Sequence, residues 1–263
     1  MKRTLKNIVF YALLGACILS PLCAQMSKEG AKALLEKADS NTSYAGTDFK
    51  ADYTIVTDKP GAGKSVMTAV MYRRDAKSTF TILITGPEND KGKGYVQFDK
   101  TIWFYDPKDR QFTYASARNR FQNTCLNNSD FIPQTLAQDY EIKSFSEVKL
   151  GKFDCVCFEL TAVTKGVDYP IVKLWVSKDD GLIRKKEDYS LSGQLLRTTA
   201  IPSYQKVEGR SVPGGMLVVD NLRGTKIDGK VQYEKSQISI ANVSFQKQAN
   251  TVYSKKYLED MSY

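Results

Sequence analysis

The stretch from residue 168 to residue 223 limits the fold of this chain more than any other. It contains four extended segments rich in β-branched and aromatic residues, at residues 171–177, 182–189, 194–201 and 211–221. Short turn sequences separate them, such as Lys178-Asp179-Asp180-Gly181, in which Asp and Gly tolerate the backbone angles of a reversal. This spacing predicts a meander of neighbouring antiparallel strands.

Most of the remaining chain follows the same pattern. Phe49, Tyr53 and Ile55 alternate with polar residues, which indicates a half-buried strand. Residues 78–85 repeat this alternation. Other short strands are expected at residues 65–73, 94–98, 101–105, 110–114, 141–148 and 153–162, and as a pair around the Asp228-Gly229 turn. We therefore expect a mainly β (α+β) chain with about ten or eleven strands.

Three segments favour helix instead. Residues 27–38 carry an apolar stripe, with Ser27 as the expected N-cap and Glu29 in the first turn. The stretch from 115 to 140 interrupts the strand pattern and suits a short helical piece within 133–139. The tail at 252–261 reads as a short terminal helix or cap. These pieces predict one N-terminal helix and short helices that could act as a lid.

The N-terminus has the features of an export signal. Lys2, Arg3 and Lys6 precede an apolar core at residues 8–19, and a cleavage site follows Ala24. No later apolar run is long enough to cross a bilayer. The sequence thus predicts a signal peptide at 1–24 and a single domain at 25–263, located in the periplasm.

The five cysteines leave two questions open. Leu14-Gly15-Ala16-Cys17 resembles a lipobox, so a lipid anchor on Cys17, or less favourably on Cys23, is the alternative to cleavage after Ala24. Cys125, Cys155 and Cys157 would remain in the exported chain, and their odd number leaves at least one free thiol. Cys125 could bridge to one of the other two, or all three could be small buried groups.

The chain is basic, with a formal net charge of +9. Three basic residues lie in the expected signal, so the exported part also stays positive. A basic exported surface can meet anionic lipid headgroups, or it can simply be well solvated. The same two alternatives apply to five basic residues. They could form a basic rim that faces lipid headgroups, or they could simply be exposed to solvent: Arg73, Arg74, Arg184, Lys185 and Lys186. Nucleic acid is not an expected partner outside the cytoplasm.

Catalytic signals are weak. The chain contains no histidine, which removes His-based triads, general bases and metal sites. The acidic pairs Asp179-Asp180 and Glu187-Asp188 read as solvated turn and strand residues. The stretch 59–65 ends like a phosphate-binding loop, but Asp58 stands where that motif needs glycine, so we expect a hairpin turn. We predict no enzyme, no cofactor and no metal, with an envelope hydrolase using carboxylates as a weaker rival.

The meander also carries a family resemblance. Its order of motifs is Leu174-Trp175-Val176, Lys178, Asp180-Gly181-Leu182, Tyr189, Gly193, Leu195, Tyr204, Lys206-Val207, Gly209-Arg210, Pro213, Met216 and Asp220. It is similar to the outer-membrane lipoprotein-sorting family of LolA-like periplasmic carriers. Asp130-Phe131 also matches a loop of that family, although Gln134 and Gln138 stand where it has acidic residues.

The resemblance implies a half-open curled antiparallel sheet or barrel that binds lipid or the acyl chains of lipoproteins. It also implies a monomer with transport partners at the inner and outer membranes. The candidate cavity residues are Phe49, Tyr53, Ile55, Phe80, Ile82, Ile84, Trp103, Tyr105, Val172, Leu174, Val176, Met216 and Val218. The alternative is a structural or interaction protein of the cell envelope whose barrel core is filled by these same side chains.

Overall fold

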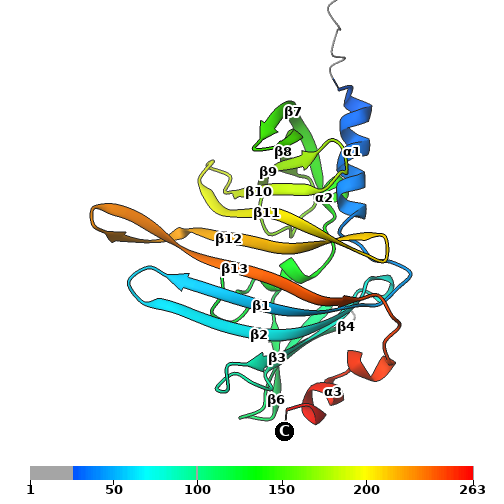
Figure 1. Cartoon of the computed structure of the whole chain (residues 1–263), viewed down its shortest axis with the longest axis vertical. Helices are drawn as coiled ribbons and strands as arrows, with labels where there is room; N and C mark the ends of the chain where they lie inside the picture. Colours follow the sequence, from blue (N-terminus) through cyan, green and yellow to red (C-terminus); the bar gives the residue numbers. More distant parts are fainter. Residues whose placement is uncertain (1–25, 99, 263) are drawn as a thin grey trace, which may run out of the picture.

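The computed structural model describes residues 26–98 and 100–262. The expected signal peptide, its cleavage site and the two cysteines Cys17 and Cys23 lie outside these residues. Within them, every strand belongs to one 13-stranded antiparallel sheet (Figure 1). The mainly β fold class predicted from the sequence is confirmed.

The first six strands are β1 (Phe49–Lys59), β2 (Gly63–Arg74), β3 (Thr79–Gly86), β4 (Gly94–Phe98), β5 (Thr101–Asp106) and β6 (Gln111–Ala115). The other seven are β7 (Tyr140–Leu150), β8 (Phe153–Ala162), β9 (Ile171–Ser177), β10 (Ile183–Tyr189), β11 (Leu195–Val207), β12 (Arg210–Ile227) and β13 (Lys230–Ser244). Strands β9 to β12 form the predicted meander. The predicted turn at Asp228-Gly229 is present, but the strand before it is the far end of β12 rather than a separate strand.

The strand order explains how the sheet curves without closing. The order is β6-β5-β4-β3-β2-β1-β13-β12-β11-β10-β9-β8-β7. The chain therefore runs from the centre of the sheet to one edge, crosses to the other edge and returns to the centre. Strands β6 and β7 each have one neighbour in this order, so the sheet is open. The predicted half-open form is confirmed, because the curled sheet does not close into a barrel.

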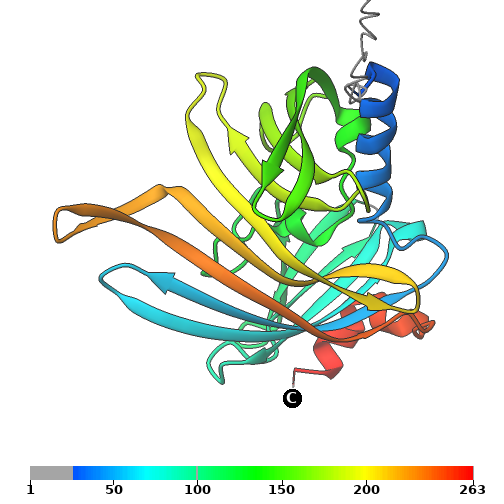
Figure 2. The ribbon, with the colours of Figure 1, turned by 45° about the horizontal axis from the view of Figure 1, so that its top comes forward.

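The N-terminal helix α1 (Lys28–Ser40) begins as predicted. The Ser27 side chain accepts a hydrogen bond from the Gly30 backbone N–H at 3.0 Å, which caps the helix. The apolar stripe of α1 is buried and packs on β8 and β9 through Ala31, Leu34, Leu35 and Ala38. The helix thus covers one half of the concave face of the sheet (Figure 2).

The segment between the two edge strands covers the other half of that face. We call residues 116–139 the crossover segment; it contains the 3₁₀ turn η2 (Asn128–Phe131) and the short helix α2 (Leu136–Asp139). Phe121, Leu126 and Phe131 enter the main apolar cluster formed by β1 to β5 and β12 to β13. The interruption seen in the sequence is therefore a packed part of the core.

The C-terminal segment packs on the opposite, convex face. Its elements are η3 (Asn250–Tyr253) and α3 (Lys255–Asp260). A further short turn, η1 (Asp75–Lys77), connects β2 to β3. Leu258 of α3 is buried against Leu83, Val96 and Tyr105. The predicted terminal helix is confirmed. Across residues 26–98 and 100–262, no helix has the length and apolar character that a membrane crossing requires.

Two smaller predictions concern turns and thiols. The stretch that resembled a phosphate-binding loop is the tight turn of the β1–β2 hairpin, with Lys59 paired to Gly63. Cys125, Cys155 and Cys157 are all free thiols, so the predicted alternative of a Cys125 bridge is not formed. Cys125 and Cys155 are buried, and burial raises the pKa of each of these two thiols.

Candidate functional site

A small cavity lies on the concave face, where α1, the crossover segment and the central strands meet. Its volume is about 140 Å³. Most of its walls are apolar side chains from β1, β10, β11, β12 and β13, among them Phe49, Ile183, Ile201, Val212, Met216 and Ile240. Three charged side chains also reach it, those of Arg73, Asp130 and Lys186. This combination of an apolar interior and a few polar groups is typical of small-molecule sites.

The predicted cavity residues fall into several groups. Phe49, Tyr53, Met216 and Val218 line the cavity. Ile55, Ile82 and Ile84 lie in the apolar cluster beneath the crossover segment, and Val172, Leu174 and Val176 lie beneath α1. Strand alternation identified one face of the sheet for all of these residues. It could not show which part of that face is covered by packing.

Two predicted residues face away from the cavity. Trp103 and Tyr105 pack in the convex cluster with Leu258, because they alternate along β5 with Ile102 and Phe104. Ile102 and Phe104 instead belong to the concave cluster. The apolar character of both faces of β5, visible in the sequence, reflects two separate packing layers.

A second, wider cleft adjoins the first cavity. Its volume is about 780 Å³, and Phe80, Gln97, Tyr114 and Arg118 are among its lining residues. The two spaces share two lining residues, Arg73 and Ile132. These two side chains therefore stand between the small apolar cavity and the wider cleft.

Arg73 connects three parts of the chain at this boundary. Its guanidinium donates from Nη2 to the Thr42 backbone oxygen at 2.7 Å and from Nη1 to the Phe131 backbone oxygen at 3.5 Å. The Nε atom lies 2.7 Å from Oδ1 of Asp75. One side chain on β2 thus links the loop after α1 to the crossover segment.

The neighbouring loop makes a further contact with the crossover segment. The Thr42 hydroxyl oxygen accepts a hydrogen bond from the Gln134 backbone N–H at 2.9 Å. Asp75 accepts one from the Tyr44 backbone N–H at 2.6 Å. Residues 131–135, which cover the boundary between the two spaces, are consequently held by backbone hydrogen bonds to Arg73 and Thr42.

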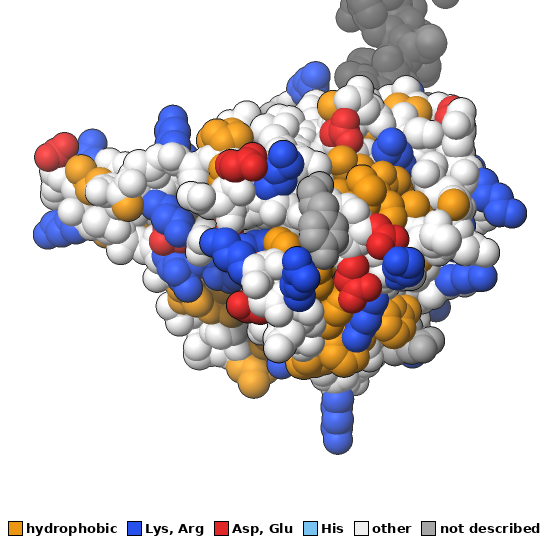
Figure 3. Space-filling view, turned by 90° about the horizontal axis from the view of Figure 1, so that it is seen from below, with side chains coloured by type: hydrophobic (Ala, Val, Ile, Leu, Met, Phe, Trp, Pro, Cys, Tyr) orange, Lys and Arg blue, Asp and Glu red, His pale blue; other side chains and the backbone are white. Residues whose placement is uncertain are grey.

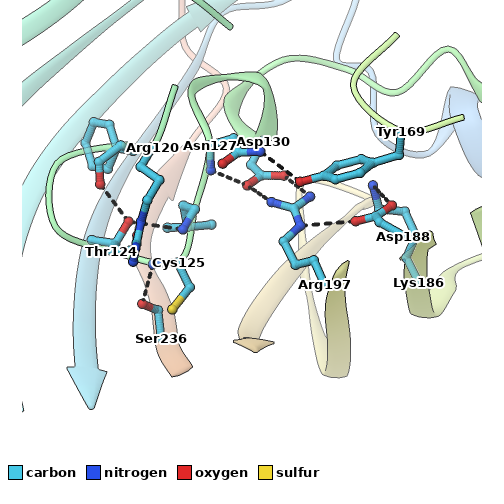
Figure 4. A network of polar contacts seen from close by, with 12 residues as sticks. Arg120, Thr124, Cys125, Asn127, Asp130, Tyr169, Lys186, Asp188, Arg197 and Ser236 are labelled. Carbon is cyan, nitrogen blue, oxygen red and sulfur yellow. Dashed lines mark hydrogen bonds and ion pairs between the residues drawn. The ribbon is translucent and has the colours of Figure 1, made fainter. Parts of the chain in front are cut away.

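A buried ionic network flanks the cavity on its other side (Figure 4). The Arg197 guanidinium donates to both carboxylate oxygens of Asp130, at 2.6 and 2.9 Å. Its Nε atom also donates to Asp188 at 3.1 Å, and Lys186 Nζ lies 3.0 Å from the same carboxylate. The network ties the crossover segment to β10 and β11.

Electrostatics keep this network charged although it is buried. Burial of the Asp130 carboxyl raises its pKa, but the positive charge and the hydrogen bonds of Arg197 outweigh that effect and hold the pKa below its usual value. For Arg197, burial lowers the pKa, while the carboxylates of Asp130 and Asp188 raise it well above its usual value. Both groups therefore remain ionised at neutral pH.

This network corrects two predictions. Asp188 was expected to be solvated, but it is fully buried between Arg197 and Lys186. The basic residues for which a rim or a solvated surface was left open form ion pairs instead: Arg73–Asp75, Arg74–Asp48, Arg184–Asp180, Lys185–Glu187 and Lys186–Asp188. Arg197 had no distinguishing sequence signal, because its role depends on carboxylates from two other segments.

The crossover segment has a third set of polar anchors, also visible in Figure 4. Arg120 Nη2 lies 3.0 Å from Oε2 of Glu234 on β13. The Cys125 backbone N–H donates to the Ser236 hydroxyl at 2.9 Å, and that hydroxyl shares a hydrogen bond with Thr57. The first part of the segment is therefore fixed to the middle of the sheet.

The site offers binding groups rather than an evident reaction centre. In the described part of the chain, no group of three or more Cys, Asp or Glu residues could hold a metal ion. Its carboxylates form ion pairs with arginine or lysine, as Asp130 and Asp188 do. What the arrangement can do is enclose an apolar group next to ionised side chains.

Comparison with solved structures places this fold in a known class. A LolA superfamily protein from Nitrosomonas europaea superposes with a TM-score of 0.70 at 22% identity, covering 86% of this chain and 98% of that chain. A protein described as an outer membrane lipoprotein-sorting domain, from Vibrio parahaemolyticus, has a TM-score of 0.72 at 14% identity, covering 86% and 97%. The chain therefore has the LolA-like fold, as the resemblance in its sequence predicted.

A third structure and a family model extend the comparison. A DUF1329 family protein from Desulfovibrio piger superposes with a TM-score of 0.73 at 17% identity, covering 88% of this chain and 98% of that chain. A family model described as "Uncharacterized protein" matches residues 76–260, more than half of the chain, so the chain belongs to that family. A comparison with curated proteins gave no match.

Proposed function

We propose that this protein is a non-catalytic carrier that binds a lipid, or the acyl chains of a lipoprotein, on the concave face of its sheet. The observation that carries the proposal is the apolar cavity beside the wider cleft, with Arg73 and Ile132 between them. The LolA-like fold supports the same class of function. We further propose that the protein works in the periplasm as one domain that follows a signal peptide at 1–24.

The small cavity alone does not accommodate a long acyl chain. Sites for drug-sized ligands usually have volumes of about 300–1,000 Å³, and this cavity has about 140 Å³. The adjoining cleft has about 780 Å³. A movement of Arg73 and residues 131–135 would join the two spaces into one groove. Ligand binding therefore requires two hydrogen bonds to break: the one that Arg73 donates to the Phe131 backbone oxygen and the one that Thr42 accepts from the Gln134 backbone N–H.

Apolar burial supplies the affinity in this scheme. Each buried methylene contributes about 0.8 kcal/mol, so a chain of ordinary length gains on the order of 10 kcal/mol before costs. Breaking the hydrogen bonds that residues 131–135 make with Arg73 and Thr42 offsets part of that gain. When these hydrogen bonds form again, they favour release of the ligand. A carrier needs both steps. The alternative, an envelope protein with a permanently filled core, predicts no such binding.

A fluorescent fatty-acid displacement assay tests the proposal. Val218 lines the cavity, and replacing it with phenylalanine fills space that a ligand would occupy. We expect Val218→Phe to lower fatty-acid affinity by about tenfold or more, since it excludes several methylenes from the site. Val219→Phe is the matched control, because the neighbouring residue of β12 points to the opposite face.

Two results would reject the carrier. Absence of fatty-acid binding at micromolar protein would favour the filled core. Equal loss of affinity in the Val218 and Val219 variants would show that the ligand does not lie on the concave face. Unfolding midpoints of both variants are measured in parallel, so that loss of fold is not mistaken for loss of binding.

A further inference from the structure

Two long hairpins extend beyond the body of the sheet (Figure 1). They are the outer parts of the β1–β2 and β12–β13 hairpins, and Figure 2 shows them projecting on the side away from α1. We call residues 56–66 and 221–235 the hairpin wing. The two tips lie near one another, since a Cβ atom built on Gly61 would lie 3.9 Å from the Thr225 methyl carbon.

Exposed apolar side chains gather on the wing. Val66 is 52% exposed, Leu222 58%, Val231 56% and Tyr233 39%. In the described residues, these are four of the eight large apolar side chains with such exposure, and the other four are Tyr114, Val163, Leu191 and Met261. Single exposed apolar residues are normal on a surface, whereas adjacent ones, as Val231 and Tyr233 are beside Gly224, indicate a binding surface.

The register of the hairpin places Val231 and Tyr233 on one face. Gly224 is paired with Tyr233, and Lys226 with Val231. A Cβ atom on Gly224 would lie 2.6 Å from a Val231 methyl carbon and 3.0 Å from the Tyr233 ring, so both side chains lean over this glycine. Glu234, the next residue, points to the concave face and pairs with Arg120 there. Val231 and Tyr233 therefore face away from the cavity.

The wing is also basic. It contains six basic and three acidic residues, namely Lys59, Lys64, Arg223, Lys226, Lys230 and Lys235 against Asp58, Asp228 and Glu234. Lys235 lies 3.6 Å from Asp58, and Glu234 is neutralised by Arg120. Lys64, Lys226 and Lys230 make no ion pair with any residue that the structure describes. Figure 3 shows apolar and basic side chains next to each other on the projecting end at its left.

We propose that the hairpin wing binds the surface of an anionic lipid bilayer. The apolar side chains of Val231, Tyr233 and Leu222 would enter the interfacial layer, while the unpaired lysines contact lipid phosphates. A protein partner fits less well, because lysine is depleted at protein–protein interfaces. The wing is separate from the cavity, so this proposal stands even if the cavity binds no lipid.

Vesicle co-sedimentation of the protein without residues 1–24 tests the inference. We expect binding to phosphatidylcholine vesicles that contain phosphatidylglycerol, weaker binding to phosphatidylcholine alone, and a decrease as salt screens the lysines. The double variant Lys226→Glu/Lys230→Glu should lower the partition coefficient by about tenfold or more, given the contribution of each basic residue near an anionic surface. Val231→Asp/Tyr233→Asp should do the same.

Matched variants control for charge and for exposure. Lys77→Glu/Lys108→Glu changes the net charge equally at exposed sites outside the wing. Leu191→Asp replaces an apolar side chain that is 81% exposed in the β10–β11 turn. Both controls should bind vesicles like the wild type. Absence of vesicle binding by the wild type overturns the proposal, as does an equal loss in wing and control variants. Wing-dependent binding to another protein without vesicle binding also overturns it.

Discussion

Arg197 shows how much of this fold depends on single charged side chains. Its guanidinium is buried and bridges Asp130 of the crossover segment and Asp188 of β10. A buried charge is tolerated only when its hydrogen bonds are satisfied. Here one arginine contacts two carboxylates that the chain places 58 positions apart, at residues 130 and 188, and Lys186 approaches the second oxygen of Asp188.

Removal of this arginine is the first test at this scale. Arg197→Met would leave Asp130 and Asp188 buried without their main partner, because Lys186 reaches only Asp188. We expect the free energy of unfolding to fall by about 3–5 kcal/mol. Arg223→Met, which removes an exposed partner of Asp220, should cost less than about 1 kcal/mol. Denaturant unfolding compares the two, and similar small losses would show that the network adds little.

Residues with local roles were the ones that sequence could predict. Ser27 caps its helix through a contact three residues away, and the α1 stripe follows from helical spacing. The prediction that Asp188 is solvated was wrong. Charged residues occupy both faces of β10, at Lys185, Lys186, Glu187 and Asp188, so the sequence pattern did not show which face is buried. The burial of Asp188 depends on Arg197, which approaches from the next strand. Such long-range partners leave no trace in local periodicity.

At the scale of elements, α3 depends on one glycine in β4. A Cβ atom on Gly94 would lie 2.5 Å from a Leu258 methyl carbon and 2.7 Å from the Ile82 backbone oxygen. Leu258 is the buried residue of α3, and it packs on the convex face of the sheet. The missing side chain at position 94 therefore makes room both for the helix and for the neighbouring strand.

Gly94→Ala should consequently disturb the docking of α3. The leucine can move, but the backbone oxygen of the paired strand cannot, so we expect a loss of about 1–3 kcal/mol in unfolding free energy. Hydrogen exchange should also become faster in α3. Gly215→Ala is the control, because its nearest contact would be 3.6 Å away. If Gly94→Ala is as stable as Gly215→Ala, then β4 can move away from the Ile82 backbone oxygen at little cost, and the prediction is wrong.

Most strands and helices could be predicted because each has its own hydrophobic period and turn residues. The packing of the elements could not. Trp103 and Tyr105 have the same period as residues that line the cavity, yet α3 covers them on the other face. The position of the crossover segment depends on Arg73, Arg120 and Arg197, which lie on or contact distant strands. Sequence therefore identified the candidate face of the sheet, but only part of the cavity wall.

At the scale of the whole molecule, the topology places one segment over the concave face. Strands β6 and β7 follow each other in the chain but form opposite edges of the sheet. The crossover segment must span the distance between them. Arg73 holds the part of it that separates the cavity from the cleft.

Loosening this part should strengthen ligand binding. In Arg73→Leu/Asp75→Asn, the hydrogen bonds that Arg73 donates to the Thr42 and Phe131 backbone oxygens are lost without leaving a buried carboxylate unpaired. If closure competes with binding, we expect fatty-acid affinity to rise by about tenfold, as a few modest hydrogen bonds allow. Faster hydrogen exchange at residues 131–135 should accompany the change.

The matched control removes the neighbouring ion pair. Arg74→Leu/Asp48→Asn deletes a buried pair between the next residue of β2 and the residue before β1, and that pair contacts the segment after β13 rather than the crossover segment. It should lower stability without raising affinity. Unchanged or weaker affinity in the Arg73 double variant would show that residues 131–135 do not close the binding site.

The connection of the crossover segment to both edges has a consequence for how such a carrier would respond to concentration. A free inhibitor can be diluted away, but a tethered one keeps a constant effective concentration near its site. Ile132, which lines both the cavity and the cleft, would therefore compete with every incoming ligand to the same extent, whatever the amount of protein in the compartment. Loading and unloading would depend on the relative affinity of membranes and partners for the ligand, and not on how abundant the carrier is.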